Sequence, residues 1–323
     1  MLKDRILTTL KFFDLQDIPL TGFEVYKYLL NDLEKIKPFL GSDWEVTGLA
    51  NSKNSNPASL DQILECLTEL SGEEVETTHG YYYLKSRGES FVEKRLRNYE
   101  YGLKRERRIE RFSAGVRHLP FIRGVALGGS QALGQYKEGS DIDLLVITDS
   151  NFLWLGRVFI TLYFQILGVR RYHSHIANRF CLNHYLAGPK QLNEDRNIYT
   201  AMEYFRLRPL YASWAIAEFK NNNFSWMRLF FSNLALAKTI AELPSQIQKV
   251  LEKVLNNSFG RQLERLSRFI LLRHIQTGEL IFVTNDELSF HPHSRKSHLF
   301  DAFFEGQQLS VASIDIAQNF VKI

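Results

Sequence analysis

Two aspartates and a glycine-rich turn are the residues of this sequence whose types and spacing could do chemistry. Asp141 and Asp143 stand two apart at the start of an aliphatic run, and ten residues separate Asp141 from Ser130. Residues i and i+2 of a strand point to the same side, so the two carboxylates should share a face. Carboxylates this close repel each other unless a cation lies between them, and Mg²⁺ prefers oxygen ligands of this kind. The pattern predicts a metal site at Asp141 and Asp143.

The turn Gly128-Gly129-Ser130 is suited to holding phosphate. Glycine lets backbone N–H groups approach a polyanion closely, and the Ser130 hydroxyl can add a further contact. Residues 130–137 are expected to form a short helix capped by Ser130, with its N-terminus facing a triphosphate. Lys137 stands near enough to contact phosphate as well. A phosphate cradle beside a paired-carboxylate metal site is typical of phosphoryl or nucleotidyl transfer.

Three strands must position these residues. An apolar strand is expected over 123–127 before the turn, and a buried strand over 141–148 carries both aspartates. The next strand is expected over 179–186, where Asn183 is the polar residue that would lie beside the aspartates. Together these strands predict a small sheet with the site at its edge.

An apolar stretch lies between the second and third of these strands, over residues 151–169. Arg157, Thr161 and Gln165 are spaced by four, which gives a polar stripe along one face of a helix. An arginine near the middle of a lone membrane span would be costly. The stretch therefore predicts a buried or half-buried helix of a soluble domain, with no membrane contact.

The turn, the helix and the aspartate strand resemble the signature of the DNA polymerase β-like nucleotidyltransferase superfamily. The resemblance extends from Pro120 to about Asn183. It implies that Gly129 and Ser130 hold the β- and γ-phosphates of a nucleoside triphosphate, and that Asp141 and Asp143 bind Mg²⁺. It also implies the reaction, in which an acceptor hydroxyl attacks the α-phosphate and pyrophosphate leaves.

The third acidic position of that family is where this sequence departs from the pattern. Catalytic members carry a third carboxylate on a later strand, and here that position is expected to be Asn183. Asparagine brings no negative charge and cannot act as a general base. Turnover could therefore be slow, could depend on Glu194 or Asp195, or could be absent. A nucleotide-binding regulatory or interaction protein that does not catalyse is the alternative function.

Histidines and a cysteine also lie close to this strand in the sequence. His173, His175, His184 and Cys181 could together bind a metal, but their spacing fits no standard zinc pattern. A polar loop and strand edge is the favoured interpretation. Arg170 and Arg171 belong to the same loop, where solvent exposure is favoured over phosphate contact.

The first 84 residues form a separate acidic part of the chain. Helices are expected over 4–13, 22–30 and 60–70, followed by a hairpin over 75–84 that turns at His79-Gly80. This order resembles a winged helix-turn-helix. The part has seven Lys and Arg against fourteen Asp and Glu, a net charge of −7, which leaves +11 elsewhere because the chain carries +4. DNA binding requires cations, so the acidic third helix argues against it and favours docking to a protein.

A basic helix is expected next, over residues 85–117. It holds eleven Lys and Arg against five acids and includes the run KRERR at 104–108. Intrahelical salt bridges, such as that between Glu100 and Lys104, would make it a solvated linker. The competing interpretation is a basic surface for RNA or another polyanion, and with it the winged helix could serve a nucleic-acid-binding regulator.

Residues 191–323 are expected to be mainly helical and to form the acceptor side of the site or a cover for the sheet. The acceptor could be RNA, protein or a small molecule. Two cysteines and the lack of an apolar signal core at the N-terminus favour the cytoplasm.

The predicted fold class is α+β: a mixed-sheet nucleotidyltransferase core with a winged-helix-like domain before it and a helical bundle after it. The expected division is a winged-helix-like domain over 1–84, a linker helix over 85–117, the core over 118–190 and a helical domain over 191–323. Within the last part, helices are expected over 198–205, 209–220, 229–243 and 245–276, and a hairpin over 279–298.

Overall fold

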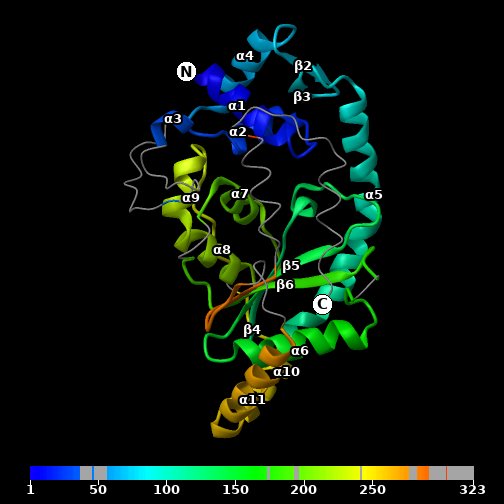
Figure 1. Ribbon diagram of the computed structural model, residues 1–323, viewed down its shortest axis with the longest axis vertical. Coiled ribbons are helices and arrows are strands. Elements are labelled where there is room, and N and C mark those ends of the chain that lie inside the picture. The colour runs from blue at the N-terminus through cyan, green and yellow to red at the C-terminus, as the bar shows by residue number, and fades with distance from the viewer. Residues whose placement is uncertain are drawn as a thin grey trace.

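A six-stranded mixed sheet lies at the centre of the molecule (Figure 1). The computed structural model describes residues 1–36, 46, 57–172, 175–192, 196–240, 242–275, 282–290 and 303. β5 and β6 run parallel, and the other neighbouring pairs run antiparallel. The chain therefore has the predicted α+β class. In spatial order the strands are β7 (Arg208–Tyr211), β4 (Ile122–Leu127), β5 (Ile142–Thr148), β6 (Phe180–Ala187), β9 (Glu287–Ser289) and β8 (Phe282–Val283).

Different helices cover the two faces of this sheet. Alternate side chains of a strand point to opposite faces. Leu144 of β5 packs with α6 (Leu153–Ile166), whereas its neighbour Leu145 packs with α7 (Ile198–Arg206) and α8 (Ser213–Asn222). The central strands are buried on both sides, which explains their nearly continuous aliphatic sequence.

The N-terminal part contains the expected helices and hairpin. Thr21 and Ser59 accept hydrogen bonds from backbone N–H groups at the starts of α2 and α4, as good N-caps do. The second helix ends at Lys27, three residues before the predicted end. The sheet order is β1-β3-β2, and the winged-helix assignment stays a prediction. The elements are α1 (Leu2–Asp14), β1 (Leu20–Thr21), α2 (Gly22–Lys27), α3 (Leu33–Ile36), α4 (Leu60–Leu70), β2 (Val75–Thr78) and β3 (Tyr81–Leu84).

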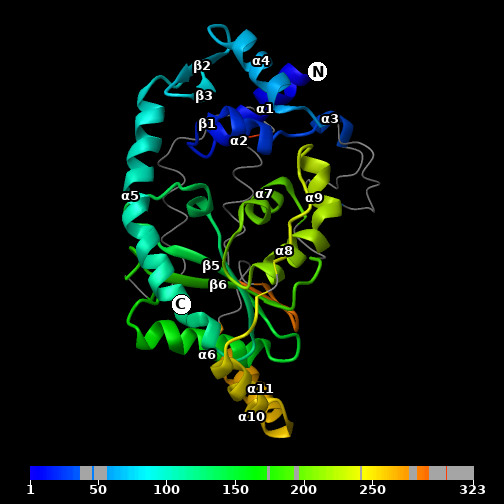
Figure 2. The ribbon, with the colours of Figure 1, turned by 180° about the vertical axis from the view of Figure 1, so that it is seen from behind.

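This N-terminal part shares a hydrophobic core with α8 and with α9 (Phe224–Phe230). The Asn31 side-chain amide donates hydrogen bonds to the carbonyl oxygens of Arg228 and Leu229, at 3.0 and 2.9 Å. The N-terminal helices are thus packed against the helices that cover one face of the sheet. Figure 2 shows the same arrangement from behind.

The long helix α5 (Ser90–Ser113) runs along one side of the molecule from the N-terminal part to the sheet (Figures 1 and 2). It begins five residues later than predicted, and its last turns give way to the 3₁₀ helix η3 (Ala114–His118). Arg95 pairs with Glu24 at 2.5 Å, and Arg105 donates to Ser140 Oγ at 2.9 Å. Both arginines are buried, so part of the basic sequence serves packing and not an open basic surface.

The helix predicted over 209–220 begins four residues late, as α8, and among the described residues the helix predicted over 229–243 does not extend past the end of α9 at Phe230. Residues 208–211 form the edge strand β7, in which Pro209 is tolerated because an edge strand need not donate from every residue. No helix covers 232–240, where Asn233 donates to the carbonyl oxygens of Tyr26 and Ala58, at 2.8 and 3.1 Å. These contacts with the N-terminal part hold that segment in a non-helical conformation.

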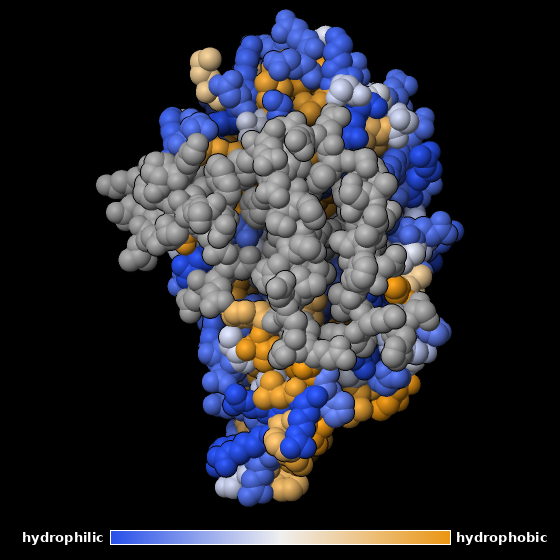
Figure 3. Space-filling model, in the orientation of Figure 1, coloured by the Kyte–Doolittle hydropathy of each residue, from blue (hydrophilic) through white to orange (hydrophobic). Residues whose placement is uncertain are grey.

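The remaining C-terminal elements agree with the prediction. α10 (Gln246–Leu255) and α11 (Ser258–His274) are separated by a break at Asn256-Asn257. A hairpin forms from β8 and β9 and adds to the central sheet, while residues 291–298 of the predicted hairpin and tail lie outside the described residues. Figure 3 shows apolar surface at the end of the molecule where α10 and α11 project. Its exposed side chains include Ile247, Val250, Val254, Leu266 and Phe269.

None of the helices among the described residues is long and apolar enough to cross a membrane. The apolar stretch over 151–169 forms α6, which packs against the sheet on one side and against α11 on the other. Arg157 of α6 is largely buried and lies over the ring of Phe290, 4.5 Å from its centroid. Arg157, one residue of the predicted polar stripe, thus packs against protein.

Candidate metal and phosphate site

The two aspartates meet at the start of β5, together with a cysteine from β6. The parallel register places Asp143 opposite Cys181. One carboxylate oxygen each of Asp141 and Asp143, and the sulfur of Cys181, all lie within 4.8 Å of one another. Asp143 is the one residue of β5 that is not fully buried. The strand therefore brings both carboxylates to one side, on the face that carries α7.

Glycine at position 129 is required by the closeness of the Asp143 carboxylate. Gly129 has a φ of 62°, and a Cβ there would lie 2.8 Å from Asp143 Oδ2. The neighbouring Gly128 donates its N–H to the carbonyl oxygen of Asp143 at 2.9 Å. The turn and the aspartate strand are thus in direct contact, with backbone and no side chain between them.

The segment after the turn is shorter than predicted. The 3₁₀ helix η4 (Ser130–Leu133) replaces the expected helix over 130–137, and Gly129 stands at its N-cap instead of Ser130. Gly134, with a left-handed φ of 69°, ends it after one turn. The structure thus offers no helix N-terminus for phosphate here. What remains is the backbone of the turn and the Ser130 hydroxyl.

Two polar residues anchor the chain between the turn and the aspartates. The Gln131 side-chain amide is buried and donates to the carbonyl oxygen of Asp141. The carbonyl oxygen of Lys137 accepts a hydrogen bond from Ser140 Oγ at 2.9 Å. Arg105 of α5 in turn contacts Ser140, the residue before Asp141. Contact between Lys137 and phosphate stays a prediction.

Arg171 is a site residue that the sequence-based interpretation placed in solvent. Its Nη1 forms an ion pair with Asp141 Oδ2 and lies 3.6 Å from Cys181 Sγ. The exposed fractions of the two charged side chains are 23% for Arg171 and 14% for Asp141. The arginine therefore faces the carboxylates and neutralises part of their charge.

Asn183 does lie beside the aspartates. Its side-chain amide nitrogen donates to Asp143 Oδ1 at 2.9 Å. The register between β5 and β6 shifts at this residue, so that Leu144 faces Leu182 and Leu145 faces His184. A β-bulge of this kind re-aims a side chain, here toward the site.

Electrostatic conditions at the site are unfavourable for two charged aspartates. Burial raises the pKa of Asp143 to about 7, and the charges of Asp141 and Glu203 act in the same direction. Arg171 and the hydrogen bond from Asn183 oppose this rise in pKa. Burial likewise raises the pKa of the Cys181 thiol well above its usual value. A divalent cation would relieve the repulsion, so the donor set fits one.

Glu203 of α7 is a carboxylate near the site that the sequence analysis missed. It lies on the helix that covers the aspartate face of the sheet, and its charge acts on Asp143. No motif marks it, because its place depends on the packing of α7 against β5. Glu194 and Asp195, considered for the third acidic position, lie outside the described residues.

The histidines do not join this cluster within the described part of the chain. His184 is buried on β6, where its Nε2 lies 2.9 Å from Glu287 Oε1 of β9. His175 stacks on the ring of Tyr172, and His173 lies outside the described residues. Among described His, Cys, Asp and Glu side chains, only Asp141, Asp143 and Cys181 gather closely enough to hold a metal.

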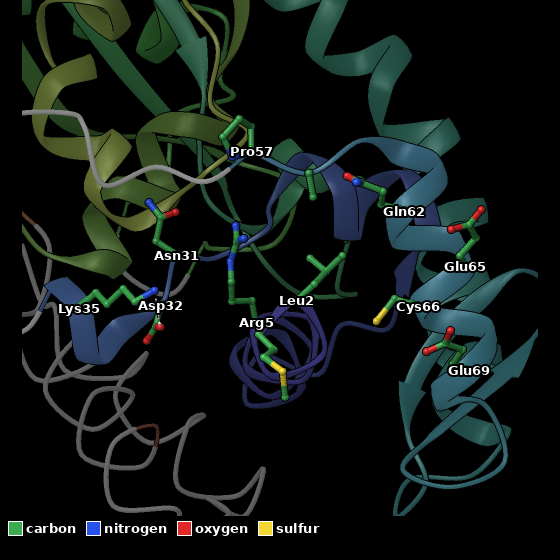
Figure 4. A pocket seen from close by; sticks show the side chains of 12 residues that line it. Leu2, Arg5, Asn31, Asp32, Lys35, Pro57, Gln62, Glu65, Cys66 and Glu69 are labelled. Carbon is green, nitrogen blue, oxygen red and sulfur yellow. Dashed lines mark ion pairs between the residues drawn. The ribbon is translucent and has the colours of Figure 1, made fainter.

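A separate pocket of about 420 Å³ lies in the N-terminal part (Figure 4). Its lining comes from α1, α4 and the segment at the start of α3, and includes Arg5, Asp32, Lys35, Glu65 and Cys66. It shares no residue with the aspartate site. Its lining carries both signs of charge and therefore indicates no particular ligand.

Comparison with known proteins bears on the segment that contains the aspartate site. Residues 109–206 match the family model of a nucleotidyltransferase domain. The matched segment runs from the end of α5 through β4, β5, α6 and β6 to the end of α7. No curated protein and no solved structure matches the chain.

Proposed function

Since residues 109–206 match the family model of a nucleotidyltransferase domain, we propose that this protein transfers a nucleoside monophosphate from a nucleoside triphosphate to an acceptor hydroxyl. The observation that carries the proposal is the contact between the glycine turn and Asp143, where a Cβ on Gly129 would lie 2.8 Å from a carboxylate oxygen. Such a contact suits a site in which phosphate and a metal-binding carboxylate must adjoin.

The residues of the site divide between holding the nucleotide and holding a metal. Asp141 and Asp143 would bind a divalent cation such as Mg²⁺, and Gly129 and Ser130 would hold the β- and γ-phosphates. When bound, the cation would neutralise charge on the phosphates and the leaving pyrophosphate. Arg171, released from Asp141, can then pair with phosphate oxygens, for which a guanidinium is well shaped.

The reaction also needs a group that accepts the proton of the attacking hydroxyl. Asn183 cannot accept it, because an amide is not a base at neutral pH. We assign this role to Glu203, a carboxylate on the same face of the sheet whose charge acts on Asp143. The acceptor oxygen then bonds to the α-phosphorus, the bond to the bridging oxygen of pyrophosphate breaks, and the proton passes to Glu203.

A nucleotide-binding protein without turnover is the alternative, and one observation favours it. The site lacks a third carboxylate on β6, and Asn183 donates a hydrogen bond to Asp143 where a further acid would be expected. Such a protein would bind nucleoside triphosphate and report it to a partner. The exposed acidic residues of α4, among them Glu65 and Glu69, suit a protein partner better than DNA.

RNA, protein and small molecules all offer hydroxyls that could attack. Two free cysteines fit a reducing compartment, and we propose the cytoplasm.

Incubation with each α-labelled nucleoside triphosphate, a divalent cation and a cell extract tests the proposal. We expect label on an acceptor with the native protein and none with Asp141→Asn/Asp143→Asn. Asp286→Asn is the control, because Asp286 forms an exposed pair with Lys190 away from the site. Glu203→Gln should bind nucleotide normally and transfer label at least about a hundredfold more slowly. Nucleotide binding without transfer to any acceptor would establish the alternative.

A further inference from the structure

The aspartate cluster contains a sulfur atom, which separates it from a site built of oxygen ligands alone. Cys181 Sγ lies within 4.8 Å of the carboxylate oxygens of Asp141 and Asp143 that complete the group. The parallel register of β5 and β6 sets Cys181 directly opposite Asp143. The thiol is therefore held by two central strands of the sheet, at the position from which a third ligand would approach.

The guanidinium of Arg171 already contacts both a carboxylate oxygen of Asp141 and the sulfur of Cys181. Nη1 of Arg171 contacts Asp141 Oδ2 and stands 3.6 Å from Cys181 Sγ. The guanidinium thus shows that positive charge can occupy the space these two donors face. A metal ion in that space would replace the arginine at Asp141 and leave it available for phosphate.

A buried acceptor beside the cluster is a second sign of a missing ligand. The Gln131 side chain is 3% exposed, and its amide nitrogen is fixed on the carbonyl oxygen of Asp141. Its amide oxygen receives no hydrogen bond from any residue in the described part of the chain. A water bound to a metal ion could supply the donor that this oxygen lacks.

We propose that Cys181 binds the metal ion of this site, so that the site prefers Co²⁺ or Zn²⁺ to Mg²⁺. The proposal rests on the proposed function, since it concerns the metal of that same site. Mg²⁺ is a hard ion that takes oxygen ligands and keeps several waters, whereas thiolate is a soft ligand that favours later divalent metals. Two carboxylates and one thiolate form a mixed set that such metals accept readily.

Titration of the native protein with Co²⁺, followed by absorbance, tests this without reference to activity. A thiolate bound to Co²⁺ gives a near-ultraviolet charge-transfer band that carboxylates do not give. The chain contains only two cysteines, so Cys66→Ser is a matched control for Cys181→Ser. We expect the band in the native protein and in Cys66→Ser and its loss in Cys181→Ser.

Affinities measured by calorimetry complete the test. Cys181→Ser should weaken Co²⁺ binding on the order of tenfold or more, and should change Mg²⁺ affinity by no more than a few fold. Circular dichroism and melting of each variant show whether it folds. An unchanged Co²⁺ spectrum and affinity in folded Cys181→Ser would overturn the proposal.

Label transfer measured with Mg²⁺ and with Co²⁺ separates this proposal from the proposed function. A Cys181-dependent Co²⁺ band with no transfer in any metal would leave the metal site standing and refute the transferase. Equal transfer rates with Mg²⁺ and Co²⁺ in both the native protein and Cys181→Ser would support the transferase and refute the Cys181 ligand. Selective loss of the Co²⁺-supported rate in Cys181→Ser would support both.

Discussion

The amide nitrogen of Asn183 lies 2.9 Å from Oδ1 of Asp143 and donates a hydrogen bond to it. A neutral side chain thus stands beside an aspartate whose pKa is raised to about 7 by burial and by the charges of its neighbours. The hydrogen bond favours the charged form of Asp143 without adding negative charge to the cluster. Asn183 therefore makes the metal-free site easier to maintain than a third carboxylate would.

Replacement of Asn183 by aspartate should reverse this balance. In metal-free buffer, Asn183→Asp loses the donor and adds repulsion, so we expect a stability loss on the order of 2 kcal/mol. Divalent cation should restore the melting temperature and bind more tightly than to the native protein. Melting curves with and without metal measure both effects. Asn178→Asp is the control, because Asn178 pairs with Tyr101.

Alanine at position 129 should disrupt the contact between the glycine turn and Asp143. Gly129→Ala combines a left-handed φ with a Cβ 2.8 Å from Asp143 Oδ2, and we expect a cost of about 2–3 kcal/mol and a loss of nucleotide affinity. Gly139→Ala is matched for backbone strain, since Gly139 has a φ of 83° with open space around it. Urea unfolding and nucleotide titration of both variants test the prediction, which requires a clearly larger effect at position 129.

Removal of the Arg171 guanidinium should strengthen metal binding and weaken nucleotide binding. Arg171 occupies Asp141 in the absence of metal, so Arg171→Gln should bind Co²⁺ alone several-fold more tightly by removing a competitor. Triphosphate affinity should fall, because a phosphate-binding cation is lost. Calorimetry measures both affinities, with Arg170→Gln as the neighbouring control. A variant that binds metal no better than the native protein would show that Arg171 does not compete.

The stability of the metal-free protein should depend on the ionisation of Asp143. Its folded pKa of about 7 lies above its usual value of 3.8, mainly through burial. Between those values the folded protein holds a proton that the unfolded chain releases, so stability falls as pH rises from about 4 to about 7. Asp143→Asn removes this dependence and should be more stable than the native protein above pH 7, by on the order of 2 kcal/mol. Unfolding free energies across this pH range check the sign.

The start of α6 is capped by a side chain from another helix. The residue before this helix is Phe152, which has no polar side chain to cap it, and Glu264 of α11 takes over that role. Its two carboxylate oxygens accept the N–H groups of Trp154 and Leu155, at 2.9 and 2.7 Å. Glu264→Ala should cost about 1–2 kcal/mol in urea unfolding, as loss of a helix cap does. As a control, Arg265→Ala at the exposed neighbouring residue should lower the free energy of unfolding far less.

Elements that depend on local sequence could be predicted well. The helix over 60–70 was expected with its observed bounds, because Ser59 caps it and its apolar residues follow helical spacing. The hairpin turn at His79-Gly80 was also expected, and both residues have positive φ. Gly129 and the aspartate strand were recognisable because glycine and carboxylate pairs carry strong local constraints.

Features that depend on packing between distant segments could not be predicted. The ion pair of Arg171 with Asp141 follows from how the loop after α6 returns to the sheet. The charge of Glu203 acts on Asp143 because α7 packs on that face of the sheet. Local propensity predicts a helix from Pro209 onward, whereas residues Arg208–Tyr211 form the edge strand β7 and the helix begins only at Ser213. In each case tertiary contacts outweigh the local preference.

A single hydrophobic core joins the first helices to α8 and α9. Phe13 and Phe230 belong to one buried cluster although they are distant in sequence, and separating them would expose apolar surface at roughly 25 cal/mol per Å². The segment over residues 109–206 is therefore not a portable module that could be excised and still fold. We expect a single melting transition, and a ligand bound to the N-terminal helices should raise the stability of the whole unit, the aspartate site included, by RT ln(1 + [L]/Kd).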